Sequence, residues 1–285
     1  MQTGSGTLFV VATPIGNLDD ISVRAREVLG SVALIAAEDT RRSGKLLDLL
    51  GIRNRLVSCH EHNEAERVGQ IIDVLAAGDD VALVSDAGTP LLSDPGFRVV
   101  SAVAAAGHTV SPVPGPSALA AAVSVAGLPT DAILFAGFLP AAQGKRSARL
   151  GELANRTETL VLYESVHRIG DTLTDLIAVF GGARRAVAAR ELTKLHETVY
   201  RGSLDDIAAQ LQADAGAGKG EYTLVIAGAA AAPAEATDLD RTLRVLLGYL
   251  GVRQAAEAAA KLLDVRKNEA YKRALQLREG SDAEY

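Results

Sequence analysis

The chain has 285 residues, of which 48% are hydrophobic, so it can bury a substantial core, and its length suggests about two domains. Its formal net charge of -6 argues against a protein that binds nucleic acid through an overall basic surface. No apolar run approaches the roughly 20 residues that span a bilayer, and residues 1–6 show no signal-peptide pattern. The single cysteine, Cys59, excludes an internal disulfide. We therefore expect a cytoplasmic globular protein with no membrane partner.

Short apolar runs alternate with helix-like segments in the first part of the chain. The predicted strands cover residues 8–12, 32–37, 56–59, 81–84 and 109–113. Four helices are predicted between these strands. The first begins near residue 21, the second ends near residue 50, the third ends near residue 77, and the fourth covers 97–106. Repeated strand and helix units of this kind predict a mainly parallel sheet with helices on both faces.

Three prolines between Pro112 and Pro116 interrupt this alternation and predict a stiff connector. Ser117 follows as a candidate cap of the next helix. The predicted strands beyond it are residues 133–136, 159–163, 185–189, 198–200 and 222–227. The predicted helices there are residues 117–126, 145–154, 167–179 and 204–213. This pattern predicts a second α/β domain with a mixed sheet.

The last part of the chain is helical in pattern. A low-complexity linker, residues 228–237, is followed by predicted helices at 240–250, 254–263 and 265–278. Basic residues on the last two helices suit a helix-turn-helix-like unit, and a packing or dimerisation appendage is the alternative. The predicted domains are residues 1–114, 115–228 and 229–285.

Polar side chains gather where the predicted strands end. The clusters are residues 13–17, 38–42, 60–64, 86–93, 164–168 and 190–194. Parallel strands run in the same direction, so the first four clusters should converge on one edge of the first sheet. The segment 85–96, rich in Asp, Ser, Pro and Gly, suits a loop that holds a ligand against its main chain. An ordinary surface connection has a similar composition and stays an alternative.

Several kinds of chemistry lack their motifs. The sequence has neither a Gly-x-Gly-x-x-Gly after its first strand nor a P-loop, which disfavours NAD and P-loop chemistry. Cys59, His60 and His62 match no usual zinc spacing, so no metal is predicted. Cys59 ends a predicted buried strand, where an inert thiol is expected. Carboxylates, histidines and arginines without a covalent nucleophile suit group transfer between two bound molecules.

Seven motifs in order make the chain resemble the 16S ribosomal RNA cytidine 2′-O-methyltransferase branch of the tetrapyrrole methylase superfamily. They are residues 11–18, 37–41, 60–64, 85–90, 93–96, 114–118 and 190–194. The resemblance covers almost all of residues 7–228. Gly88-Thr89-Pro90 stands where the superfamily has Gly-Asp-Pro, as is usual in the ribosomal RNA branch, and this argues against a porphyrin substrate. The resemblance implies two α/β domains with S-adenosyl-L-methionine in the cleft between them, a small C-terminal helical domain and a homodimer.

The resemblance also implies the site residues. Carried over by position, the cofactor would contact Pro14, Asp86, Gly88, Thr89, Leu92, Ser93, Ser117, Ala118, Glu164, Leu192, Tyr222 and Thr223. A ribose hydroxyl is weakly acidic, so methyl transfer to it calls for a general base or a polarising contact. The candidate catalytic residues are Glu38, Asp39, Arg41, His60, Glu61, Arg190 and Lys194. Glu38, Asp39, His60 or Glu61 would lie near the sugar, with Arg41 and Lys194 on phosphates. Each could instead serve a salt bridge or order a loop, and Glu38 could pair with Arg41.

The predicted function is therefore S-adenosylmethionine-dependent 2′-O-methylation of a cytidine ribose in 16S ribosomal RNA of the small subunit. Reading a ribose 2′-hydroxyl separates RNA from DNA, so DNA is not an expected partner. One alternative is a methyltransferase acting on a tetrapyrrole or a protein, which would not need the basic tail. Another is a non-catalytic module that binds an adenosyl ligand or RNA and tolerates loss of Glu38, His60 and Arg190.

Overall fold

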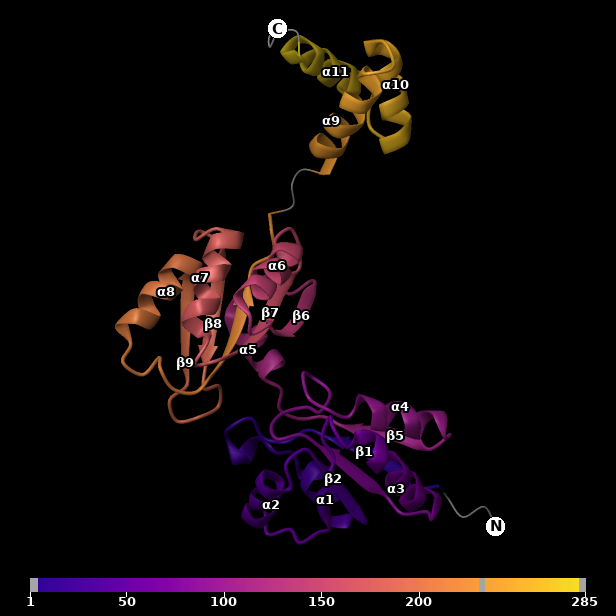
Figure 1. Ribbon diagram of the computed structural model, residues 1–285, viewed down its shortest axis with the longest axis vertical. Helices are drawn as coiled ribbons and strands as arrows, with labels where there is room; N and C mark the ends of the chain where they lie inside the picture. The colour runs from indigo at the N-terminus through magenta and orange to yellow at the C-terminus, as the bar shows by residue number, and fades with distance from the viewer. Residues whose placement is uncertain (1–4, 231–233, 282–285) are drawn as a thin grey trace. The chain divides into compact units, whose positions relative to one another are not determined.

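Five parallel strands form the first sheet of the computed structural model, which describes residues 5–230 and 234–281. The strands are β1 (Thr7–Val11), β2 (Leu34–Ala37), β3 (Leu56–Ser58), β4 (Val81–Val84) and β5 (Thr109–Val113). Their order in the sheet is β3-β2-β4-β1-β5. Figure 1 labels β1, β2 and β5 of this sheet. Both faces of β2 and β4 are buried, as the apolar runs predict for central strands of a parallel sheet.

Helices cover both faces of this sheet. They are α1 (Val23–Ser31), α2 (Thr40–Leu49), α3 (Glu64–Ala76) and α4 (Phe97–Ala105), with a short 3-10 turn η1 (Leu18–Asp20). Leu29 of α1 packs with Ile35 of β2 on one face. Ile71 of α3 and Val99 of α4 pack with Leu34 of β2 on the other. Successive strand residues point to opposite faces, so both helix layers are anchored by the same short strands.

The second sheet is mixed, as predicted. Its strands are β6 (Ile133–Phe138), β7 (Thr159–Ser165), β8 (Arg185–Arg190), β9 (Thr198–Ser203) and β10 (Glu221–Ile226), in the order β6-β7-β10-β8-β9. β10 runs antiparallel to both of its neighbours. Tyr222, near the start of β10, therefore pairs with Glu164 near the end of β7 and with Arg190 at the end of β8. The start of one strand and the ends of two others share one edge.

Helices again lie on both faces of the second sheet. α6 (Gln143–Leu153), α7 (Ile169–Phe180) and α8 (Leu204–Ala213) pack on one face, and α5 (Ala118–Ala126) packs on the other. Ser117 stands at the N-cap position of α5, but its side chain makes no capping hydrogen bond. The hydroxyl of Tyr163 accepts the Leu119 N–H instead, at 3.1 Å. The prediction that Ser117 caps this helix was wrong, because a side chain of β7 occupies that role.

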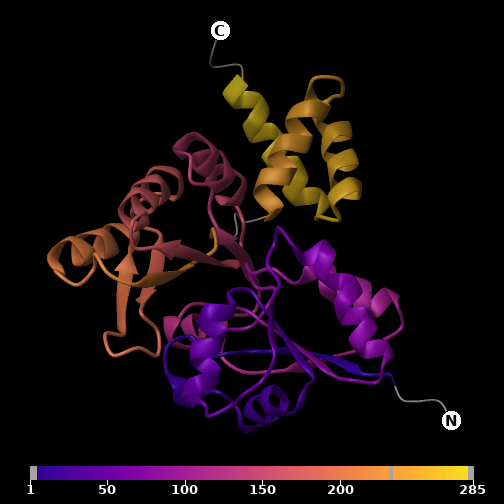
Figure 2. The same cartoon turned by 60° about the horizontal axis from the view of Figure 1, so that its bottom comes forward.

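The chain divides into two compact units, Met1–Gly228 and Ala229–Tyr285. The two sheets fall on either side of the domain limit predicted at residue 114, which stays a prediction. The second unit contains α9 (Ala234–Leu247), α10 (Val252–Leu263) and α11 (Lys267–Ser281), which pack on one another (Figure 2). Their shared core includes Leu243, Ala256 and Ala270. α9 begins inside the segment predicted as a linker, because its alanines favour a helix. None of the described helices is long and apolar enough to cross a membrane.

Candidate active site

A cavity of about 370 Å³ lies where loops of the two sheets meet within the first unit. We call it the first cavity. It is lined by Ile15, Glu38, Arg42, Asp86–Thr89, Leu92–Asp94, Ser117, Ala118, Phe138, Tyr163–Ser165, Glu191, Leu192, Lys194 and Glu221–Thr223. Of the residues that the resemblance assigns to the cofactor, all except Pro14 line this cavity, and Ile15 lines it in place of Pro14.

The loop after β4 is joined to the loop after β1 by two main-chain hydrogen bonds. The Thr13 N–H donates to the Gly88 oxygen at 2.8 Å, and the Gly88 N–H donates to the Thr13 oxygen at 3.0 Å. Gly88 has a φ of 81°, which glycine adopts without strain. The Thr89 hydroxyl donates to the Pro116 oxygen at 3.0 Å. These hydrogen bonds join three chain segments at the wall of the first cavity.

Two leucines of the cavity wall sit between residues in the left-handed backbone region. Leu91 (φ 71°) and Ser93 (φ 68°) flank Leu92, and Glu191 (φ 52°) and Thr193 (φ 65°) flank Leu192. Such a conformation costs a non-glycine residue about 1–2 kcal/mol. Strain of this kind gathers where a loop is shaped to present its backbone and side chains to a ligand.

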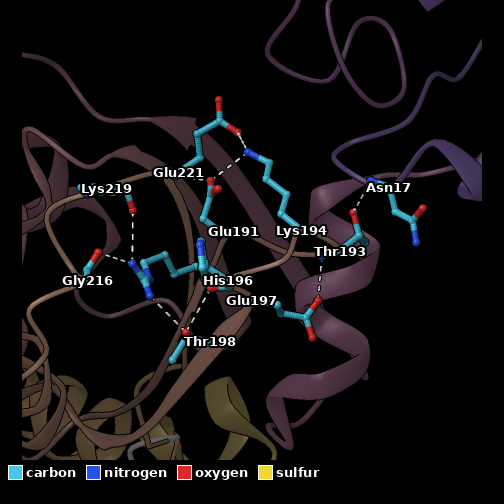
Figure 3. A network of polar contacts seen from close by, with 11 residues as sticks. Asn17, Glu191, Thr193, Lys194, His196, Glu197, Thr198, Gly216, Lys219 and Glu221 are labelled. Carbon is cyan, nitrogen blue, oxygen red and sulfur yellow. Dashed lines mark hydrogen bonds and ion pairs between the residues drawn. The ribbon is translucent and has the colours of Figure 1, made fainter. Parts of the chain in front are cut away.

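Side-chain contacts hold the strained loop after β8 (Figure 3). The Thr193 hydroxyl accepts the Asn17 N–H at 3.1 Å, which ties this loop to the loop after β1. The Lys194 ammonium donates to Glu191 at 2.8 Å and to Glu221 at 3.1 Å. Lys194, predicted to bind phosphate, therefore lies on the cavity wall with two carboxylates already on its ammonium.

Asp39 and Arg41 lie at the start of α2 and do not line the first cavity. Asp39 is the N-cap residue and accepts the Arg41 N–H at 2.8 Å. The Arg41 guanidinium also bonds to Asp39, at 2.8 Å, and these hydrogen bonds hold the pKa of Asp39 well below its usual range. Arg41 thus pairs with Asp39 rather than with Glu38, and its side chain is 87% exposed.

Three carboxylates meet on the side of the first cavity formed by β2 and β4. Asp86 pairs with Arg42 at 3.0 Å and accepts the Asp39 N–H at 3.1 Å. Burial, together with the charge of Asp86, raises the pKa of Glu38. Burial raises the pKa of Asp94 to about 6, with a contribution from the charges of Glu38 and Asp86. Asp94 can therefore take up a proton near neutral pH, as a general base must.

Asp94 is the functional candidate that the sequence reasoning missed. It belongs to the motif 93–96 that supports the family resemblance, but only Ser93 was carried over from that motif. The signal that singles it out is its burial beside two other carboxylates, which spacing along the chain does not reveal.

A second cavity of about 590 Å³ adjoins the first. It is lined by Glu38, His60, Glu61, His62, Glu64 and Ser93–Arg98, so the two cavities share Glu38, Ser93 and Asp94. The loop after β3 was expected to converge with the loops after β1, β2 and β4. It lines the second cavity, which adjoins the first, and does not line the first cavity itself. The buried Glu64 carboxylate accepts the Gly96 N–H and ties this loop to the start of α4.

Arg190 is buried away from both cavities. Its guanidinium donates to the carbonyl oxygens of Gly216 and Lys219 and to the Thr198 hydroxyl, the last at 3.2 Å (Figure 3). Asp214 lies 3.6 Å from it. These contacts fasten the segment that precedes β10, so Arg190 positions the start of that strand.

Glu164 lines the first cavity but is engaged within the protein. Its carboxylate accepts the Thr172 hydroxyl at 2.7 Å and the Ser165 N–H at 2.8 Å. Burial raises the pKa of the Cys59 thiol to about 11, so this thiol is a poor nucleophile. Within residues 5–230 and 234–281, no three His, Cys, Asp or Glu side chains gather so that they could hold a metal ion.

The first cavity suits a ligand that carries positive charge and an apolar part. Its charged residues are six acids, Glu38, Asp86, Asp94, Glu164, Glu191 and Glu221, and two bases, Arg42 and Lys194. Ile15, Leu92 and Leu192 add apolar surface. The volume of the cavity lies in the range that holds small molecules.

Comparison with known protein families gives two matches along the chain. Residues 7–208 match the family described as tetrapyrrole (corrin/porphyrin) methylases. Residues 233–278 match the family described as the RsmI C-terminal HTH domain.

Three bacterial relatives bear the name ribosomal RNA small subunit methyltransferase I. The protein of Pseudomonas aeruginosa is 50% identical over 275 residues, which cover 95% of this chain and 98% of the relative. The protein of Xylella fastidiosa is 48% identical and covers 90% of this chain and 94% of the relative. The protein of Escherichia coli O157:H7 is 45% identical and covers 96% of both chains.

Solved structures share the fold. Uroporphyrin-III-C-methyltransferase from Thermus thermophilus superposes with a TM-score of 0.54 at 22% identity, over 77% of this chain and 94% of that one. Diphthine synthase superposes with a TM-score of 0.59 at 17% identity, over 78% of this chain and 90% of that one. At these identities the likeness speaks for the fold alone.

Proposed function

Because the chain belongs to the tetrapyrrole methylases, within the group named ribosomal RNA small subunit methyltransferase I, we propose that it methylates the 2′-hydroxyl of a cytidine in 16S ribosomal RNA. The methyl donor of this reaction is S-adenosyl-L-methionine. The observation that carries the proposal is the acidic first cavity, which adjoins a second cavity through a wall that contains two carboxylates, Glu38 and Asp94.

The charge and the volume of the first cavity suit S-adenosylmethionine. When bound, this cofactor supplies an activated methyl group on a sulfonium. The residues that would hold it are Asp86, Gly88, Thr89, Leu92, Ser93, Ser117, Ala118, Glu164, Leu192, Tyr222 and Thr223, with Pro14 shaping the loop after β1. The acidic lining favours a cationic sulfonium, and the leucines between strained residues offer apolar surface to an adenosyl group.

A carboxylate of the wall shared by the two cavities accepts the proton of the acceptor hydroxyl in this proposal. Asp94 and Glu38 both face the first and the second cavity, and burial raises the pKa of each. We assign proton removal to the Asp94 carboxylate, with Glu38 beside it. Holding the hydroxyl in line with the methyl donor supplies much of the remaining rate.

Other residues serve the RNA or the loops in this proposal. His60 and Glu61 lie in the second cavity near the acceptor, and Arg41 and Arg42 are exposed for RNA phosphates. In the second unit, Arg266 and Lys272 are exposed cations suited to further phosphate contacts.

Asp39, Arg190 and Lys194 act as positioning residues, since their described contacts hold loops of the site. The proposal also includes a homodimer that acts in the cytoplasm on the small ribosomal subunit.

The proposal is tested by transfer of label from methyl-labelled S-adenosylmethionine to small subunits that lack the native methylation. We expect label in the 16S RNA and none in ribosomal protein, DNA or an added porphyrin. Cofactor binding is measured by titration calorimetry on the same sample. Binding of the cofactor with label only in protein or porphyrin would contradict the RNA proposal.

A further inference from the structure

The second cavity is a further candidate binding site, because most of its lining residues do not line the first cavity. Its volume of about 590 Å³ lies in the range of ligand pockets. All of its lining residues come from the part of the chain that forms the first sheet: the loops after β2, β3 and β4 and the start of α4. It meets the first cavity at Glu38, Ser93 and Asp94. A nucleoside there would place its ribose at this shared wall and its base toward α3 and α4.

The carboxylates of the second cavity differ in what they already bind. Glu64 is buried and holds the Gly96 N–H, while Glu38 and Asp94 belong to the shared wall. Glu61 is exposed, and among the described residues it has neither a hydrogen bond nor an ion pair. Glu61 is therefore the carboxylate of this pocket that a ligand can engage without breaking a contact of the fold.

Aromatic rings line the same pocket. Phe97, the first residue of α4, is 73% exposed, although its side chain is apolar. The rings of His60 and His62 lie 6.0 Å apart in an edge-on arrangement. Nδ1 of His60 is buried with no hydrogen-bond partner in the part of the chain that is described. Exposed aromatic faces and unused polar atoms are the features with which proteins stack and hydrogen-bond single unpaired bases.

We infer that the second cavity is the pocket of the acceptor nucleotide, in which Glu61 accepts a hydrogen bond from the amino group of cytosine and Phe97 stacks on its ring. This inference rests on the proposed function. Carboxylates accept from cytosine N4, whereas uracil presents a carbonyl oxygen at the same position. The acidic lining also disfavours a phosphate inside the pocket, which leaves the sugar and the base as the parts that enter it.

Glu61→Gln tests the contact to the base, because an amide both donates and accepts hydrogen bonds. The substrates are small subunits reconstituted with 16S RNA that carries either the native cytidine or a uridine at the methylated position. For the unchanged protein we expect kcat/KM to favour cytidine by at least about tenfold. For Glu61→Gln we expect this preference to fall about tenfold. Glu66→Gln, on an exposed residue of α3 outside both cavities, is the matched control and should keep the preference.

Phe97→Ala tests the stacking contact. We expect KM for the subunit to rise about tenfold while the Kd for S-adenosylmethionine stays unchanged, because a stacked base loses its platform. Leu49→Ala, which truncates an exposed apolar residue of α2 outside both cavities, is the control.

The outcomes separate this inference from the proposed function. RNA methylation with a preference for cytidine that Glu61→Gln leaves unchanged would overturn the assignment of Glu61. An equal loss on cytidine and uridine would show that Glu61 only orders its loop and would overturn it as well. Cofactor binding by the unchanged protein without methylation of any RNA would overturn the proposed function and this inference with it.

Discussion

The two sheets of the first unit bring side chains to the same cavity in different ways. In the first sheet every strand runs in one direction, so the loops after β1, β2 and β4 meet at one edge. In the second sheet β10 is antiparallel, so Glu221–Thr223 at its start join the ends of β7 and β8. The first sheet contributes the wall shared by the two cavities, and the second sheet closes the first cavity. We therefore expect substitutions in the first sheet to change mainly kcat, and substitutions in the second sheet to change mainly the Kd for S-adenosylmethionine.

The largest expected effect comes from Asp94→Asn in the first sheet. An amide cannot take the hydroxyl proton, so kcat should fall by about 10²- to 10⁴-fold while the Kd for S-adenosylmethionine changes little. For the unchanged protein, kcat/KM should rise with pH and level off above about 6, where Asp94 is ionised. Steady-state kinetics over pH 5–8 measure both, with Asp73→Asn on the exposed face of α3 as the control. Retention of most of the activity by Asp94→Asn would rule out this role.

The next effect comes from the second sheet. Gly137 sits at a bulge of β6 with a φ of 62°, and an added Cβ would lie 2.6 Å from the Ser93 hydroxyl. Gly137→Ala should weaken S-adenosylmethionine binding about tenfold, because left-handed backbone costs alanine about 1–2 kcal/mol and Ser93 must move. Titration calorimetry measures this loss. Gly151→Ala, in an open position on α6, should leave the affinity unchanged, and equal affinities for both variants would refute the expected contact.

A smaller effect concerns stability: Asp94→Asn, which should lower activity, should raise the free energy of unfolding. The pKa of Asp94 is raised from 3.8 to about 6, so the folded state favours the protonated form. The stability linked to that proton is present below pH 3.8 and is lost as the pH rises through about 6. At pH 8 the free energy of unfolding of Asp94→Asn should therefore exceed that of the unchanged protein by about 1 kcal/mol after allowance for solvent screening. Urea denaturation measures this difference. The gain should vanish toward pH 4, and a gain that persists there would exclude this origin.

The smallest effect is expected at the junction of β7 and α5. Tyr163→Phe removes the hydroxyl that accepts the Leu119 N–H, so the free energy of unfolding should fall by about 1 kcal/mol. Because this contact lies at the wall of the first cavity, cofactor affinity should fall only a few-fold while kcat holds. Urea denaturation and calorimetry measure the two quantities. A large fall in kcat would instead give Tyr163 a part in the chemistry.

Sequence reasoning reached the first sheet more fully than the second. Apolar runs and polar strand ends predict that residues such as Glu38 and Asp86 converge. The carboxyl ends of parallel strands lie at one edge of the sheet whatever the order of the strands, so the strand order need not be known. Tyr222 and Thr223 precede rather than follow a strand core, so only the family resemblance pointed to them. The pattern predicted a mixed second sheet, but it did not indicate that β10 would lie antiparallel between β7 and β8.

The roles of single charged residues were the least accessible to the sequence. Asp39 and Arg190 have the residue types that a site requires, yet their described contacts are a helix cap and a loop anchor. Asp94 was not among the predicted site residues, because its raised pKa comes from burial and from the charges of Glu38 and Asp86, which lie elsewhere in the chain. Charge type can be predicted from a motif, whereas the contacts of that charge depend on how the loops pack.

The most direct test of the account is to identify the methylated nucleoside. Small subunits that lack the native methylation are incubated with the protein and S-adenosylmethionine, and their 16S RNA is digested to nucleosides for mass spectrometry. We expect 2′-O-methylcytidine, formed by the unchanged protein and nearly absent with Asp94→Asn. A methyl group on the base, or on a nucleoside other than cytidine, would contradict it.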